Sequence, residues 1–143
     1  MAIEDTNKII RAFLAGETTL TDIVSTRIVT PRLPENCTLP ALSFFTRGGE
    51  SHPYIPGLVT PSVQFDCWAT DAEIAGVFVR GSIYARAVYR ALYDNLQGIQ
   101  NIDVGSYQIM SAIEEVQGQD LTDTEIPKYF RVLTFFSIMI RAE

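Results

Sequence analysis

The sequence predicts a single α+β domain, and three patterns in its 143 residues carry that prediction. Residues Ser62–Ala69 alternate apolar and polar side chains, with the period of two that is typical of a strand over a core. The segment Asp71–Gln97 repeats apolar residues at the spacing of a long amphipathic helix. The segment Tyr129–Ile140 is apolar on both alternating faces, which predicts a central strand covered on both sides.

The composition suits one domain spanning residues 1–143, without internal repeats or a linker. With 47% apolar and 20% charged residues, a chain of this length can bury a core without metal or disulfides. No run approaches the roughly 18 apolar residues that cross a bilayer, so we expect no membrane contact. The acidic first residues lack the basic region of a secretory signal, so we expect a cytosolic protein in which Cys37 and Cys67 are free and mostly buried thiols.

Net negative charge is concentrated after Arg90, because residues 91–143 hold 8 Asp and Glu but only 3 Lys and Arg. The 11 Lys and Arg and 17 Asp and Glu give a net charge of −6. No Lys or Arg lies between Arg90 and Lys128. Such a charge distribution disfavours a protein that grips nucleic acid. It leaves open a solvated acidic face or an acidic wall that faces another component.

The first third of the chain predicts two helical segments and two strands. Ile3–Ala15 has apolar residues at helical spacing and is followed by Gly16, a residue typical of helix ends. A short helical turn is expected over Thr19–Val24. Strands are expected at Arg27–Pro31 and Leu39–Arg47, and the prolines near the first of them forbid a long central strand there.

Residues Gly48–Pro61 are rich in proline and glycine and predict a long exposed loop or an irregular hairpin tip. The loop also carries apolar side chains that a free surface loop does not need, namely Tyr54, Ile55, Leu58 and Val59. Its prolines reduce the entropy lost on docking. We therefore expect the loop to contact a partner, the alternative being that it folds back on its own domain.

The strand Ser62–Ala69 places Cys67 toward the core and Trp68 outward. An outward Trp beside polar neighbours indicates a protein contact or cover by a neighbouring segment. A capping-box pattern at Thr70–Glu73 predicts the start of the long helix. Gly81 lies on the apolar stripe of that helix, which indicates close packing against the sheet.

The last third predicts three more strands. Ile102–Gly105 and Tyr107–Gln117 are expected to be strands, although the second lacks a clean period, which leaves a helix as the alternative. An acidic turn region is expected over Gly118–Pro127. Tyr129–Ile140 then completes the domain.

The residue inventory does not favour catalysis. His52 is the sole histidine, and a general base needs a positioned partner. Cys37, His52 and Cys67 lack a fourth zinc ligand and the tight pair spacing of zinc sites. The sequence has no P-loop and no dinucleotide-binding glycine pattern. We therefore expect no catalytic, metal-binding or cofactor-binding residues.

Four short motifs occur in a specific order along the chain. They are R-I-V-T-P-R-L-P at 27–34, L-P-A-L-S-F at 39–44, V-Q-F-D-C-W-A at 63–69 and Y-F-R-V-L-T-F at 129–135. In this order the chain resembles the tail completion, or tail terminator, family of long-tailed bacteriophages. The resemblance extends over nearly the whole chain and implies a mostly antiparallel sheet with an N-terminal helix and one long helix packed against it.

The resemblance also implies a structural role in the virion. Such proteins form a ring, typically a homohexamer, on the head-proximal end of the tail tube, assembled in the host cytoplasm. The implied partners are further copies of the chain, the tail tube protein and a neck or head-completion protein, while DNA passes through the lumen without specific binding. The alternatives are a head-completion (neck) protein and, from a different class, a small-ligand-binding or enzymatic α+β domain.

Two groups of residues are candidates for this role. The predicted partner interface comprises Tyr54, Ile55, Leu58, Val59 and Trp68. An acidic channel wall repels DNA phosphate, which lets the genome slide. The predicted lumen-facing acids are Asp103, Glu114, Glu115, Asp120, Asp123 and Glu125, the alternative being a solvated position on the outer wall of the ring.

Overall fold

The computed structural model describes residues 5–34, 37–52, 54–55, 57–122 and 129–142, and these residues form the expected α+β domain. The elements are α1 (Thr6–Ala15), α2 (Thr18–Val24), β1 (Ile28–Val29), β2 (Ala41–Ser51), β3 (Leu58–Ala69), β4 (Ala72–Ile74), β5 (Val77–Val79), α3 (Gly81–Leu96), β6 (Gln100–Val104), β7 (Tyr107–Thr122) and β8 (Phe130–Ala142). In this part of the chain no helix is long and apolar enough to cross a membrane.

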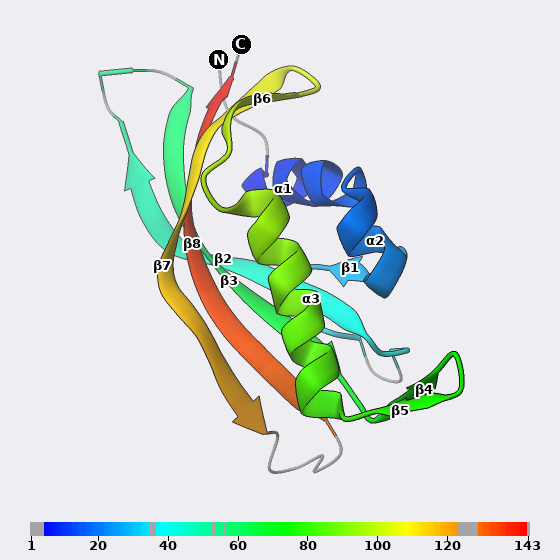
Figure 1. Ribbon diagram of the computed structural model, residues 1–143. Coiled ribbons are helices and arrows are strands. Elements are labelled where there is room, and N and C mark those ends of the chain that lie inside the picture. The colour runs from blue at the N-terminus through cyan, green and yellow to red at the C-terminus, as the bar shows by residue number, and fades with distance from the viewer. Residues whose placement is uncertain (1–4, 35–36, 53, 56, 123–128, 143) are drawn as a thin grey trace.

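The main sheet has the strand order β1-β2-β3-β8-β7-β6, and β4 and β5 form a separate hairpin. Every described pairing is antiparallel except the short β1–β2 pair. The sheet is strongly curved, and α1, α2 and α3 all lie on one side of it (Figure 1). On the other side, which we call the open face, the sheet carries no described helix.

The core lies between the sheet and the three helices. Three buried rings, Phe44, Phe65 and Phe136, come from neighbouring strands, and their centroids are 5.5 and 5.7 Å apart in succession. Leu14 and Leu92 bury the apolar stripes of α1 and α3 in the same cluster. Burial of each such side chain contributes about 1.5–3 kcal/mol. The alternation predicted for Ser62–Ala69 is confirmed, with Cys67 fully buried.

The predicted long helix from Asp71 to Gln97 is wrong in its first ten residues. The chain instead forms the β4–β5 hairpin, and α3 begins only at Gly81. Ala75 and Gly76 both have positive φ, 52° and 80°, which is the geometry of a two-residue hairpin turn. The β-branched and aromatic residues that follow favour a strand over a helix.

Asp71 caps α3 from the far side of this hairpin. Its carboxylate accepts a hydrogen bond of 2.6 Å from the backbone N–H of Gly81. The close packing predicted for Gly81 is confirmed, because a Cβ there would lie 2.8 Å from Cε2 of Phe130 and 2.9 Å from the carbonyl carbon of Thr70. Such distances leave no space for a methyl group.

The strand predicted at Tyr107–Gln117 is confirmed but is longer than expected. β7 continues to Thr122, so the acidic turn predicted from Gly118 is wrong for its first five residues, and residues 123–127 lie outside the described part. β8 is central, as predicted. The prediction that β8 is covered on both faces is wrong, because its outward side chains are only half-buried, among them Leu133, Phe135 and Met139.

The Gly48–Pro61 segment is a hairpin more than a loop. β2 runs on to Ser51 and β3 starts at Leu58, with Ser51 paired to Val59. Positive φ values at Gly48 and Gly49 accompany a register shift between Thr46 and Gly49.

Near the N-terminal end of the chain, α1 begins at Thr6 with Asp5 as its N-cap, and the predicted start at Ile3 lies outside the described residues.

Candidate assembly surfaces

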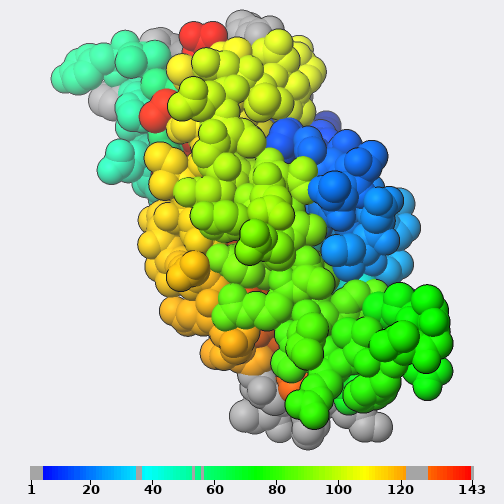
Figure 2. Space-filling model, in the orientation of Figure 1, coloured from blue at the N-terminus to red at the C-terminus, as the bar shows by residue number. Residues whose placement is uncertain are grey.

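The tip of the β2–β3 hairpin projects from one end of the sheet (Figures 1 and 2). Tyr54 is 94% exposed and Ile55 is 51% exposed. Leu58 and Val59, which the sequence grouped with them, are half-buried, and Val59 packs against the core. The structure therefore divides the predicted interface loop into an exposed tip and an anchored base.

The base of this hairpin is fixed by hydrogen bonds within the hairpin and to the end of β8. The backbone N–H of Ile55 donates to the carbonyl of His52 (3.2 Å), and the His52 ring lies 3.2 Å from the Thr60 hydroxyl. The backbone N–H of Ala142 donates to the carbonyl of Gly57 (2.8 Å). An anchored tip loses less entropy on docking than a free loop.

The β4–β5 hairpin, which we call the arm (Ala72–Val79), projects from the opposite end of the molecule (Figure 2). Its apolar side chains are in water: Val77 is 64% exposed, Phe78 61%, and Ile74 is also exposed. An isolated two-stranded hairpin is marginally stable in water, and large exposed apolar patches are typical of interaction sites. The predicted helix concealed this surface, although Gly76 is a residue that tolerates the positive φ of a hairpin turn.

Trp68 lies on the open face, as its predicted outward orientation requires. Its indole N–H donates a hydrogen bond of 2.8 Å to the Ser43 hydroxyl. The Arg131 guanidinium lies 5.1 Å from the indole ring centre, and Tyr129 meets the ring edge-on. Trp68 is thus half-covered by side chains of its own domain.

Asp66 is a carboxylate buried on the same face. It is 5% exposed, with Arg131 Nη1 at 3.7 Å from Oδ1 and Gln64 Nε2 donating to Oδ2 at 3.3 Å. Among the described residues Oδ1 has no hydrogen-bond partner. Burial raises the pKa of Asp66, and the positive charge of Arg131 together with the Gln64 hydrogen bond offsets part of that rise.

A second cation–aromatic contact lies further along the open face. Arg47 of β2 places its guanidinium 3.8 Å from the ring centre of Phe135. Close by in the sheet, Ile113 of β7 is 58% exposed opposite Ser137. The open face therefore combines half-exposed apolar side chains with two arginines.

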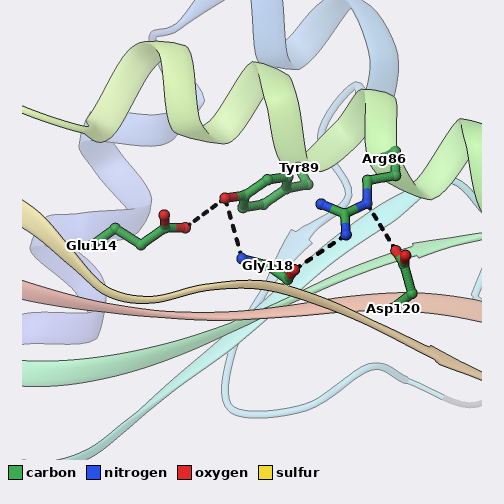
Figure 3. A network of polar contacts seen from close by, with 5 residues as sticks. All are labelled: Arg86, Tyr89, Glu114, Gly118 and Asp120. Carbon is green, nitrogen blue, oxygen red and sulfur yellow. Dashed lines mark hydrogen bonds and ion pairs between the residues drawn. The ribbon is translucent and has the colours of Figure 1, made fainter.

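Two of the predicted lumen acids have partners on the helix side of the sheet (Figure 3). The Tyr89 hydroxyl donates to Oε2 of Glu114 (2.7 Å), and the Thr134 hydroxyl donates to the same oxygen (2.6 Å). Arg86 forms an ion pair of 2.8 Å with Asp120. These contacts join α3 to β7 and β8. Burial is the largest cause that raises the pKa of Tyr89 to about 12.

The same network explains why β7 passes so close to α3. Arg86 Nη2 donates to the carbonyl of Gly118 (3.2 Å), and the Gly118 N–H donates to the Tyr89 hydroxyl (3.2 Å). A Cβ at Gly118 would lie 2.8 Å from the Tyr89 ring. Arg86 is therefore engaged with β7, and within the helix Arg90 pairs with Asp94 at 3.2 Å.

The other predicted acids are dispersed. Glu115 is exposed and accepts a hydrogen bond from Ser62, and Asp103 lies exposed on the edge strand β6. Asp123 and Glu125 lie outside the described residues. Of the four described acids, Glu114 and Asp120 thus lie together against α3, whereas Glu115 and Asp103 lie elsewhere, and their position relative to a channel stays a prediction.

The described residues contain no group of three or more His, Cys, Asp or Glu side chains that could hold a metal. Burial raises the pKa of the Cys67 thiol well above its usual value, which keeps it protonated. Cys37, expected to be mostly buried, is half-exposed. A hollow of about 410 Å³ lies between α1, α2 and β1, and Arg11 is among the described residues that line it.

Comparison with known proteins gives no assignment. No protein-family model matches the chain, and no curated protein matches it.

Proposed function

We propose that this protein is a structural virion protein that forms a ring on the head-proximal end of a bacteriophage tail tube. The ring ends tube polymerisation and joins the tail to a neck or head-completion protein. The proposal assigns no enzymatic activity and no cofactor to the chain. It places the protein in the virion after assembly in the host cytoplasm.

The observation that carries the proposal is the pair of projecting apolar hairpins at opposite ends of the subunit (Figure 1). One hairpin exposes Tyr54 and Ile55, and the other exposes Val77 and Phe78. A monomeric protein has no need for two such projections. A ring subunit needs one surface for its neighbour and further surfaces for the layers above and below.

Ring closure explains how such a protein ends polymerisation. Contacts between two different surfaces of one chain are head-to-tail, and they close into a ring when the rotation between subunits is right. The ring then matches the end of the tube on one side and presents a different side to the neck. The exposed β2–β3 tip is the surface we assign to that axial contact.

Electron microscopy of the purified protein tests the proposal. We expect rings with sixfold symmetry and an open lumen, and native mass spectrometry of the same sample should give about 95 kDa for six copies of 15.9 kDa. Added to purified tail tubes, the protein should sit at one end and stop elongation. Binding at the portal end of heads, without binding to tubes, would favour the neck protein instead.

A further inference from the structure

We propose that the arm of one copy docks on the open face of the next copy and forms the subunit contact of the ring. This inference rests on the proposed function and names the partner surface of the arm. The arm has exposed apolar side chains on both of its faces, because Ile74 pairs with Val77 and Glu73 pairs with Phe78 across the hairpin. Either its side chains stay in water or another surface covers them.

The open face is the complementary surface on the same chain. Its centre consists of half-exposed apolar side chains on β2 and β8, and the exposed Ile113 of β7 continues the patch. The apolar members on β2 and β8 are Phe45, Leu133, Phe135 and Met139. Covering both patches removes apolar area from water at about 25 cal/mol per Å².

The charges of the two surfaces also match. Glu73 lies beside Phe78 on one face of the arm, and it is exposed. On the open face, Arg47 and Arg131 flank the apolar centre, each lying over an aromatic ring, and Arg131 is also paired with the buried Asp66 at 3.7 Å. An arm that lays Phe78 on the apolar centre brings the Glu73 carboxylate toward these arginines. Such complementarity fixes register and disfavours wrong partners.

The placement of the two surfaces favours a second copy as the occupant. The arm extends from the lower end of the sheet toward the side where the helices lie, whereas the open face is on the opposite side (Figure 1). One copy therefore cannot fold its arm onto its own open face. In a head-to-tail ring each copy gives one arm and receives one, so all arms and all open faces are covered.

Photo-cross-linking tests this contact directly. A benzophenone amino acid replaces Phe78, an exposed position where the change should leave the fold intact. Light and heavy isotope-labelled copies are mixed at about 1 mM, irradiated and digested. We expect cross-links between light and heavy copies that map to residues 131–139. The matched control carries the probe at Ile102 on β6 and should give no link to that segment.

The outcomes separate this inference from the proposed function. Cross-links from position 78 to any other segment, or none between copies, would overturn the arm contact. If rings still capped tail tubes in that case, the proposed function would stand. Cross-links to residues 131–139 in a protein that forms no ring and binds no tube would support the contact and refute the proposed function. A probe at Ile74 repeats the measurement from the other face of the arm.

Discussion

Gly81 provides the sharpest stability prediction, because two opposing effects act on one methyl group. In a helix, Gly→Ala normally stabilises by up to about 1 kcal/mol. At Gly81 the added Cβ would lie 2.8 Å from Cε2 of Phe130 and 2.9 Å from the Thr70 carbonyl carbon. Overpacking of this kind costs about 1–3 kcal/mol. The Phe130 ring can shift, but the Thr70 backbone is held where β3 ends.

We therefore expect Gly81→Ala to lower the free energy of unfolding by about 1 kcal/mol, with overpacking exceeding the helix gain. For a domain of this size the melting temperature should fall by roughly 4 °C. The matched control is Gly16→Ala at the end of α1, where φ is −90° and the nearest atom to a new Cβ is 3.5 Å away. The control should be neutral or stabilising. If calorimetry showed Gly81→Ala at least as stable as the wild type, the packing argument would be refuted.

Three further predictions concern polar contacts and the hairpin tip. Tyr89→Phe removes a donor to Glu114 and should cost about 1–2 kcal/mol in urea unfolding, whereas Tyr93→Phe, with no such bond described, should cost less. The pKa of Asp66 is raised by burial, so the folded state binds this proton more tightly than the unfolded state, and the free energy of unfolding falls as the pH rises above the ordinary carboxyl pKa of 3.8. Asp66→Asn should remove this pH-dependent loss of stability. An unchanged pH profile in the variant would contradict the burial of the carboxyl group. The double change Tyr54→Ser and Ile55→Ser should leave the melting temperature within about 1 °C of the wild type, because both side chains are exposed. The same change should abolish the joining of tails to heads. Normal yields of infectious particles would count against an interface at the hairpin tip.

The core strands could be predicted from the sequence because burial there follows the strand period. Val63, Phe65 and Cys67 point to the core in strict alternation, so β3 was recognised directly. β7 showed no clean period because its register shifts at three places along β8, and each irregularity displaces the alternation. The apolar content of β8 predicted cover on both faces, but composition does not say whether that cover comes from the same chain.

The start of α3 could not be predicted from its capping pattern. Thr70–Glu73 fits a capping box, yet Asp71 caps a helix that begins ten residues after it. The β-branched and aromatic residues after the turn favour a strand, and Gly76 readily adopts the positive φ that a hairpin turn requires, whereas Ala75 adopts its φ of 52° against its steric preference. The same error hid the arm, because a helix over Asp71–Gln97 would place Phe78 on its buried apolar stripe. Of the predicted interface, Tyr54 and Ile55 are exposed as expected.

The central claim is that this chain forms the ring at the upper end of a phage tail. A cryo-electron microscopy reconstruction of the virion that carries the chain tests it most directly. The account predicts a single sixfold ring of this fold between the tail tube and the neck, with the β2–β3 tips directed along the tail axis. A reconstruction that placed the chain elsewhere in the particle, or found no such ring, would contradict the account.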